Sequence, residues 1–194
     1  TGLGKARTLK HLWQAPFTLQ PNVVAGIRAE METAKAGGKG RVVAKMNSLL
    51  ESEVIDALYE ASKAGVEIDL IIRGVCALRP GVPGLSENIR VRSIIGRFLE
   101  HHRIFYFLAG GKETVYLSSA DWMERNFFKR IELAFPILDP KLKKRVITEG
   151  LKFYLADNQQ GWEMSSQGAY QRRRSSRSKP HNAQGELMVT LGNV

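Results

Sequence analysis

The stretch RVVAKMNSLLESEVIDALYEASKAGVEIDLII, residues 41–72, decides the fold class. Its first six residues form a short, apolar, β-branched run that is typical of a buried strand. A helix is expected next, starting at a capping box of Ser48 and Glu51 and ending at Gly65. Residues 66–72 begin with alternating polarity and close on three aliphatic side chains, as a largely buried strand does. The stretch therefore predicts a strand, helix, strand unit of an α/β protein.

The chain on either side of this unit extends the same pattern. A helix rich in Ala, Glu and Met is expected over 22–36, before a glycine-rich break. Residues 78–88 are punctuated by proline and glycine and predict a loop, placed after a buried strand where α/β folds commonly bind ligands. Asp139 and Pro140 indicate the start of a helix that runs to about Tyr154. Further strands are predicted at 89–94, 104–108, 114–118 and 130–135.

Length and composition favour one domain of ordinary size. The chain has 194 residues, of which 43% are hydrophobic and 25% charged, so it can bury a core. No apolar run is long enough to span a bilayer and no secretory signal pattern opens the chain, so we expect a cytoplasmic protein, at most peripheral at a membrane. The single cysteine, Cys76, excludes an internal disulfide. We expect a linker over 1–20, the folded domain over 21–165 and a basic, flexible tail over 166–194.

The charge balance indicates an anionic partner. The formal net charge is +10, which suits nucleic acid, an acidic membrane surface, nucleotide phosphates or polyphosphate, and does not choose among them. Part of the excess lies in a serine-rich tail, which we expect to be solvated and mobile, with anion binding as a secondary role. The basic residues of this tail are Arg172, Arg173, Arg174, Arg177 and Lys179.

Side chains suited to phosphoryl chemistry gather in two segments that flank a predicted hairpin. The first is LEHHR, residues 99–103, and the second is LSSADWMERN, residues 117–126. If both segments lie at neighbouring strand ends, a histidine, hydroxyl groups and an acid or amide can converge. An imidazole titrates near neutral pH, so it can attack phosphorus or donate a proton to a leaving oxygen. Taken singly, each histidine is more often structural or exposed.

Arginines at two predicted strands give this segment its context. Arg73 closes a buried strand, and Arg130 stands beside Glu132 in a predicted apolar strand, where an unpaired charge would be costly. Arg130 is therefore expected either to form a buried ion pair or to aim its planar guanidinium at phosphate oxygens. Lys45 and Asn47, at the end of the first strand, either extend such a surface or form a pair at the loop edge.

Six blocks of the sequence resemble polyphosphate kinases of the histidine-phosphorylating kind. They occur in the order typical of that family, and the chain is similar to the second of its two phospholipase D-like domains. The resemblance implies an α/β fold with a phospholipase D-like mixed sheet flanked by helices. The blocks are APFTL at 15–19, AKMNSL at 44–49, LIIRG at 70–74, LRPGVPGLSENIRVR at 78–92, FLEHHR at 98–103 and YLSSADWMERN at 116–126.

The resemblance also implies roles for individual residues. His101, Arg73 and Arg130 match the histidine and the phosphate-contacting arginines of the second domain, and they are the expected catalytic residues. His102 stands where the family varies, and Glu132 matches an acidic residue that can orient a site histidine. The residues expected to bind ATP or ADP are His101, Arg73, Arg130, Lys45, Asn47, Arg103, Ser119 and Asp121.

The activity that the resemblance implies is reversible transfer of the terminal phosphate of ATP to inorganic polyphosphate. A phosphohistidine would form on a neighbouring domain, and Mg²⁺ would take its ligands outside this chain, so no metal site is expected here. Expected partners are ATP, polyphosphate and the remaining domains of a parent enzyme that forms homo-oligomers. We expect no specific nucleic acid, and we expect the chain alone to be inactive.

Two alternatives belong to other functional classes. A polyanion or nucleic-acid binding module would draw on the net charge, although the basic tail is accompanied by serine and few aromatic residues. A phospholipase D-like phosphodiesterase would carry a His-x-Lys motif. Arg103 stands at the position of that lysine, which argues against hydrolysis.

Overall fold

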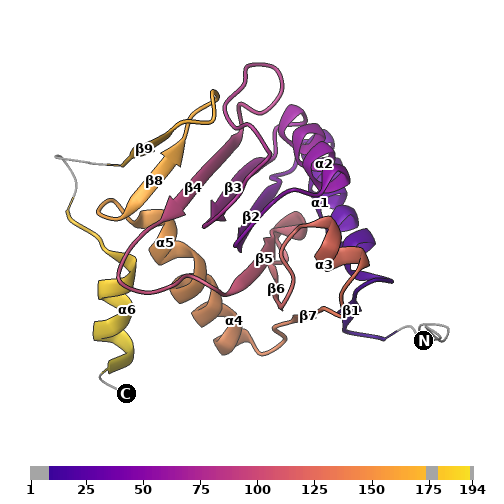
Figure 1. The fold of residues 1–194 in the computed structure, drawn as a ribbon. Helices are drawn as coiled ribbons and strands as arrows, with labels where there is room; N and C mark the ends of the chain where they lie inside the picture. Colours follow the sequence, from indigo (N-terminus) through magenta and orange to yellow (C-terminus); the bar gives the residue numbers. More distant parts are fainter. Residues whose placement is uncertain (1–8, 174–178, 193–194) are drawn as a thin grey trace.

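A mixed β-sheet forms the frame of the computed structural model, which describes residues 9–173 and 179–192 (Figure 1). Within these residues the sheet has nine strands in the order β1-β7-β6-β5-β2-β3-β4-β8-β9. The strands are β1 Trp13–Gln14, β2 Arg41–Met46, β3 Glu67–Ile72, β4 Ile89–Ile94, β5 Arg103–Phe107, β6 Thr114–Ser118, β7 Leu133–Pro136, β8 Gly161–Met164 and β9 Tyr170–Arg172. The helices are α1 Leu19–Lys35, α2 Ser52–Lys63, α3 Glu124–Phe128, α4 Pro140–Ile147, α5 Phe153–Ala156 and α6 Ala183–Gly192, with a π-helical turn, Thr148–Lys152, between α4 and α5.

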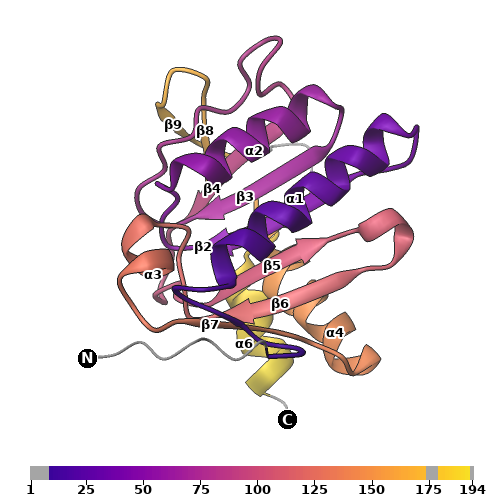
Figure 2. The ribbon, with the colours of Figure 1, turned by 90° about the vertical axis from the view of Figure 1, so that its right-hand side faces the viewer.

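The centre of the sheet is parallel and its flanks are antiparallel. Strands β2, β3 and β4 run parallel, with β2 crossing to β3 through α2, while β5 and β8 pair antiparallel on either side. Helices α1 and α2 cover one face, and α4, α5 and α6 cover the other (Figures 1 and 2). Buried apolar side chains fill both interfaces, with Val42 and Ala44 of β2 on the α1 and α2 side and Val43 on the other. The predicted α/β sheet flanked by helices is confirmed.

The central unit forms as predicted, except at the start of its helix. Strand β2 has the predicted bounds, and Gly65, with φ of 92°, follows the end of α2. The capping box is wrong, because the cap of α2 is Glu51, whose carboxylate accepts from the backbone N–H groups of Glu53 and Val54 at 3.2 and 2.8 Å. Leu49 and Leu50 lie before the helix and donate their N–H groups to Val75 and Trp122 of neighbouring loops.

The strand predicted over 130–135 begins three residues later, at Leu133. Helix α3 and the turn after it occupy 124–132, and the Asn126 side chain closes this turn by donating to Glu132 at 2.8 Å. Arg130 is therefore exposed rather than buried in a strand. Because water solvates its charge, Arg130 does not need the ion-pair partner that a buried arginine would require.

The C-terminal region contains a strand and a helix that the sequence did not predict. Strand β9 pairs with β8, and α6 docks with Ala183 fully buried and its N–H donating to the Asp157 carboxylate at 2.8 Å. The flexibility expected of the tail stays a prediction, and Arg174 and Arg177 lie outside the described residues. Strand β1 likewise places residues before 21 in the sheet. None of the described helices has the length and apolarity needed to cross a membrane.

Candidate phosphate site

Three loop segments run side by side where β2 and β3 end. Leu49 forms parallel bridges with Cys76 and with Trp122. Its N–H donates to the Val75 carbonyl at 2.9 Å, and the N–H of Leu50 donates to the Trp122 carbonyl at 2.9 Å. These bonds bring the residues just after β2, just after β3 and just after β6 to one edge of the sheet.

Asp121 is the hub of this edge. Its carboxylate, on a residue only 5% exposed, accepts from the Asn47 backbone N–H at 2.7 Å and from the Asn47 amide at 3.3 Å. Arg103 donates to it through Nε at 3.2 Å and Nη2 at 3.0 Å. Burial alone would raise the pKa of Asp121, but the hydrogen bonds from Arg103 and Asn47 outweigh it and hold the pKa below its usual value. Asp121 is therefore an anion that fixes its neighbours.

Arg73 joins this cluster through Asn47. Its Nε donates to the Asn47 side-chain oxygen at 2.9 Å, so Asn47 links the guanidinium to Asp121. Among the described contacts, neither Nη group of Arg73 has a protein partner. Arg73 also lines a pocket of about 270 Å³ with the aromatic side chains of Trp162 and Tyr170. A half-buried guanidinium whose Nη groups have no carboxylate partner is suited to anion binding.

His101 is linked to Asp121 through Arg103, which bonds to both residues. Its backbone carbonyl accepts from Arg103 Nη1 at 2.9 Å, and its side chain is exposed. Arg130 is exposed too, and the described residues give it no hydrogen bond or ion pair. The contacts thus unite Arg73, Asn47, Arg103 and Asp121, place His101 beside them, and leave Arg130 unconnected.

Ser119 and Glu132 bond to each other rather than to a histidine. The Ser119 hydroxyl donates to Glu132 and accepts from the Leu133 N–H at 3.1 Å. Glu132 also accepts from the Asn126 amide. These bonds hold the turn between α3 and β7, and the described contacts of Glu132 include no histidine.

Lys45 lies on the opposite face of the sheet, against α5 and α6. Its side chain is 2% exposed, forms an ion pair with Glu100, lies 2.7 Å from His102 Nε2, and sits 3.5 Å from the ring centroid of Tyr154. The expectation that Lys45 extends the phosphate surface is therefore wrong. Within β2, Lys45 shares the face of Val43, whose apolar cluster includes Ile147, Tyr154 and Ala183 of the covering helices.

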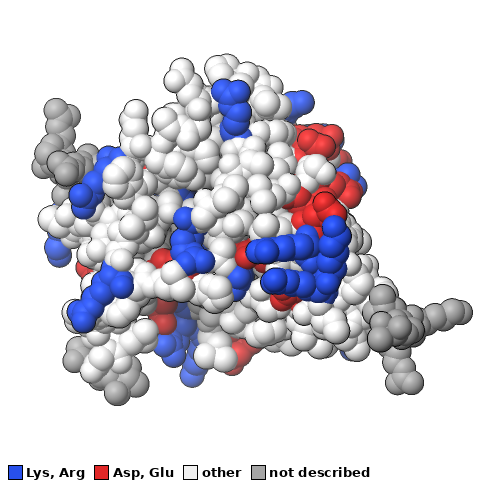
Figure 3. Space-filling model, viewed as in Figure 1, with Lys and Arg blue, Asp and Glu red and all other residues white. Residues whose placement is uncertain are grey.

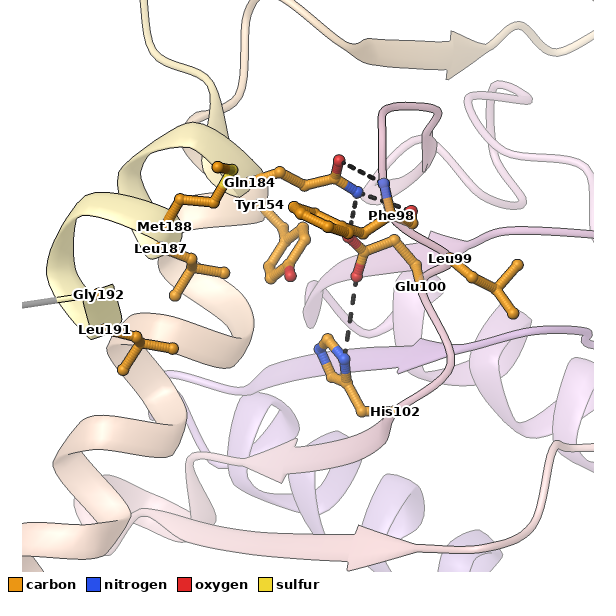
Figure 4. Close-up of a pocket in the computed structure, with 10 residues that line it drawn as sticks. All are labelled: Phe98, Leu99, Glu100, His102, Tyr154, Gln184, Leu187, Met188, Leu191 and Gly192. Carbon is orange, nitrogen blue, oxygen red and sulfur yellow. Dashed lines mark hydrogen bonds and ion pairs between the residues drawn. The ribbon is translucent and has the colours of Figure 1, made fainter. Parts of the chain in front are cut away.

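Burial sets the protonation of this second cluster. It lowers the pKa of Lys45 to about 8, against the opposing pull of Glu100. Burial, reinforced by the Lys45 ammonium, lowers the pKa of His102 to about 4, so this imidazole is neutral at pH 7. The network includes Glu100, Tyr154 and Gln184, which sequence reasoning did not single out (Figure 4). A lysine in the middle of an apolar strand was the available signal, because such a charge requires a partner.

The described residues contain no group of three or more His, Cys, Asp or Glu side chains that could hold a metal ion. Magnesium prefers carboxylates with free oxygens. The oxygens of Asp121 accept from Arg103 and Asn47, and those of Glu132 accept from Ser119 and Asn126. The carboxylates of Asp121 and Glu132 are thus already acceptors for donors of the protein itself.

Basic side chains also mark the surface around the site. On the face shown in Figure 3 a cluster of Lys and Arg gathers over α3 and the turn that follows it. Arg125, Lys129 and Arg130 of this region are all exposed. Such a cluster raises the local concentration of anions.

Comparison with known proteins gives these features a family context. A family profile described as "Polyphosphate kinase C-terminal domain 2" matches residues 12–184. The chain is 66% identical over 189 residues to a protein named "Polyphosphate kinase" from Burkholderia cenocepacia (strain HI2424), and 65% identical over 188 residues to its namesake from Paraburkholderia phytofirmans. Each alignment covers 97% of this chain and 27% of the relative, so the chain spans about a quarter of the length of these proteins.

Solved structures give the same result at the level of the fold. The crystal structure of polyphosphate kinase from Porphyromonas gingivalis superposes with a TM-score of 0.92 at 41% identity, covering 96% of this chain and 28% of that one. Nuc from Salmonella typhimurium, a phospholipase D family member, superposes with a TM-score of 0.56 at 17% identity, covering 79% of this chain and 96% of that one. At that identity the second match concerns the fold alone, and it agrees with the phospholipase D-like sheet expected from the sequence.

Proposed function

The chain belongs to the polyphosphate kinase C-terminal domain 2 family, and from that premise we propose that it forms one wall of a site that transfers the terminal phosphoryl group between ATP and inorganic polyphosphate. The observation that carries the proposal is the edge cluster around Asp121, in which Arg73 is held through Asn47 with its Nη groups unengaged. A preorganised cation of this kind stabilises the charge that spreads over a phosphoryl group in the transition state.

We assign His101 to general acid or base catalysis at the bridging oxygen. Its imidazole is exposed at the same edge, and an imidazole exchanges protons readily near neutral pH. Arg103 and Asp121 hold the backbone at His101 through the bond from Arg103 Nη1 to the His101 carbonyl. Three of the five N–H groups of Arg103 are engaged, so this side chain supports the segment and keeps one N–H on each Nη nitrogen for a phosphate oxygen.

We assign Arg130 to contact with the phosphate chain from the side of α3. Its guanidinium is exposed, and among the described residues it has no carboxylate partner that would compete with phosphate. The neighbouring cations Arg125 and Lys129 strengthen the attraction of a long polyanion to this side. An extended polyphosphate would then be held by separate cations along its length.

The rest of the reaction would take place on other parts of the parent protein. A histidine there would become phosphorylated, which divides one displacement into two in-line steps. Magnesium bound to the nucleotide phosphates would take its protein ligands outside this chain, since the carboxylates at this site are engaged by arginine, asparagine and serine donors. The parent would work as a homo-oligomer within the cytoplasm, at most peripheral at a membrane.

The direct test is the full-length enzyme with His101→Ala, Arg73→Gln or Arg130→Gln. Loss of a general acid or base lowers the rate by roughly a hundredfold or more, and loss of a positioned cation has an effect of similar order. Arg28→Gln, on the exposed surface of α1, is the matched control for a lost charge and should keep the wild-type rate. If phosphohistidine still forms and turns over at the wild-type rate without His101, the assignment is wrong.

Binding measurements separate this function from general polyanion binding. Titration of the chain with polyphosphate and with DNA of matched charge, each at two salt concentrations, reports how much of the binding is non-specific. We expect Arg73→Gln to weaken polyphosphate binding more than DNA binding. Equal weakening of both, with the same salt dependence, would favour a polyanion-binding module instead.

A further inference from the structure

The segment that carries His101 is held by side chains rather than by the sheet. Pairing of β4 ends at Ile94, the Ile95 N–H still donates to the Gln160 carbonyl at 3.1 Å, and pairing of β5 begins only at Arg103. Between these points the described residues show no backbone-to-backbone hydrogen bond. The position of His101 therefore depends on whatever fixes its immediate neighbours.

Gln184, in the first turn of α6, fixes the part of this segment that precedes His101. Its side-chain oxygen accepts from the Phe98 N–H at 3.0 Å, and its amide nitrogen donates to the Phe98 carbonyl at 2.9 Å and to the Glu100 carboxylate at 2.6 Å (Figure 4). The residue is 4% exposed, so water does not compete for these bonds. The side chain of Gln184 thus restrains both Phe98 and Glu100.

Lys45 restrains the same segment from the sheet. Its ion pair with Glu100 is buried, and its contact with His102 places Glu100 and His102 on the face covered by α5 and α6. Arg103 bonds to Asp121 at the phosphate edge. His101 lies between these restraints, and its side chain is exposed.

Gly96 permits the close approach of α6. A Cβ atom at this position would collide with the side-chain oxygens of Gln160 and Gln184. The absence of a side chain at Gly96 therefore gives the side-chain oxygen of Gln184 the space that it occupies beside Phe98. An alanine there would push the amide of Gln184 away from its three partners.

We propose that Gln184 is a positioning residue for the phosphoryl transfer, holding His101 in register with Arg73 through Phe98 and Glu100. The inference rests on the proposed function, because it assumes that His101 takes part in the reaction. Gln184 itself lies in α6, on the face of the sheet covered by α4, α5 and α6, and is not proposed to contact phosphate. Its loss should reduce turnover without reducing the affinity for polyphosphate, since Arg73 and Arg130 do not depend on it.

The test uses the full-length enzyme with Gln184→Met, which keeps the volume of the side chain and removes all three bonds. Because a misplacement of about 1 Å at a reacting group can lower a rate by about a hundredfold, we expect kcat to fall by roughly ten- to a hundredfold with KM for polyphosphate nearly unchanged. Gly96→Ala should have the same effect. Hydrogen exchange over residues 96–103 should accelerate in both variants, which reports the freed segment directly.

The matched control is Gln20→Met. Gln20 is 5% exposed and donates its amide to the Glu53 carboxylate at 2.7 Å between α1 and α2, so it carries a buried glutamine bond of the same kind far from His101. This variant should keep the wild-type kcat. If Gln184→Met fails to fold, Gln184→Asn keeps an amide that is one methylene too short to reach both partners and gives the same comparison.

A double-mutant cycle separates this inference from the proposed function. In an enzyme that already carries His101→Ala, Gln184→Met should lower the residual rate by less than about twofold, because the group it positions is gone. A loss that is as large in this background as in the wild type would overturn the positioning role, as would a kcat for Gln184→Met equal to that of Gln20→Met. An enzyme with His101→Ala that retains full activity would instead overturn the proposed function.

Discussion

Replacement of Asp121 by asparagine should destabilise the chain far more than removal of an exposed ion pair of equal length. The Arg103–Asp121 pair and the Lys129–Glu124 pair both have a closest N–O distance of 3.0 Å. The side chains of the first pair are 12% and 7% exposed, and those of the second are 69% and 70% exposed. The two pairs therefore differ mainly in burial.

The expected magnitudes follow from that difference. Removing one partner of a buried pair costs about 3 to 5 kcal/mol, because the other charge stays buried and unpaired. Asparagine keeps one acceptor oxygen for Asn47, so we expect the lower end, about 3 kcal/mol, for Asp121→Asn. An exposed pair contributes about 0 to 1 kcal/mol, which sets the expectation for Glu124→Gln. For a chain of this size, 3 kcal/mol corresponds to a fall in Tm of about 6 to 12 °C.

Urea unfolding followed by tryptophan fluorescence measures both variants, since the fully buried Trp122 is the neighbour of Asp121. Equal losses in the two variants, or a loss below about 1 kcal/mol for Asp121→Asn, would refute the view that Asp121 is the hub of the edge cluster.

Three further predictions concern other parts of the chain. Lys45→Met should lower the free energy of unfolding by about 3 kcal/mol, because Glu100 keeps its buried charge without a partner. The affinity of the folded variant for polyphosphate, measured by calorimetry, should equal that of the wild type. A clear loss of affinity would show that Lys45 does contact phosphate. Burial would raise the pKa of Asp69, but hydrogen bonds from Arg90 and the charge of Arg41 hold this pKa below the ordinary 3.8. The ionised carboxylate therefore stabilises the fold fully above about pH 5, and this stabilisation is lost as pH falls through the folded-state pKa. Acid unfolding of Asp69→Asn, followed by circular dichroism, should therefore depend less on pH below about 5 than that of the wild type, and an unchanged acid profile would contradict this assignment. Gly65→Ala should lower the free energy of unfolding by about 1 kcal/mol, since φ there is 92°, and a urea midpoint equal to that of the wild type would count against this reading.

Local pattern was enough to predict the positions of the central strands. The strand over 89–94 has the predicted bounds, and that over 104–108 differs by one residue at each end, because β-branched and aromatic runs between turn signals identify strands well. Asp139 caps α4 as predicted, with its carboxylate accepting from the Leu142 N–H at 2.8 Å. These features depend on residues close together in the chain.

The errors arise where contacts distant in sequence decide the structure. Lys45 and Glu100 are 55 residues apart, and nothing local to either indicates the pair. Helix α6 was missed because its docking depends on the burial of Ala183 and Gln184 at its first turn, and not on a long apolar stripe. The cap of α2 moved to Glu51 because the preceding residues bond to two other loops.

The candidate site could be predicted in part. Family resemblance placed Arg73, Asn47, Arg103 and Asp121 in one set, and the described contacts link these four. Arg130 remains a prediction, because the basis for its burial was a strand that starts after it. Which members of the set bind phosphate and which hold the others could not be read from spacing, since it depends on which donors already have partners.

Nuclear magnetic resonance of the nitrogen-15-labelled chain during titration with polyphosphate tests the central claim most directly. The claim is that phosphate binds at the edge formed by the residues after β3 and before β5. We predict that the largest shifts occur at the Arg73 side-chain N–H and at the backbone N–H groups of Gly74 and His101, with little change at Lys45. Shifts confined to Arg172, Arg173 and Lys179, with Arg73 unaffected, would contradict it.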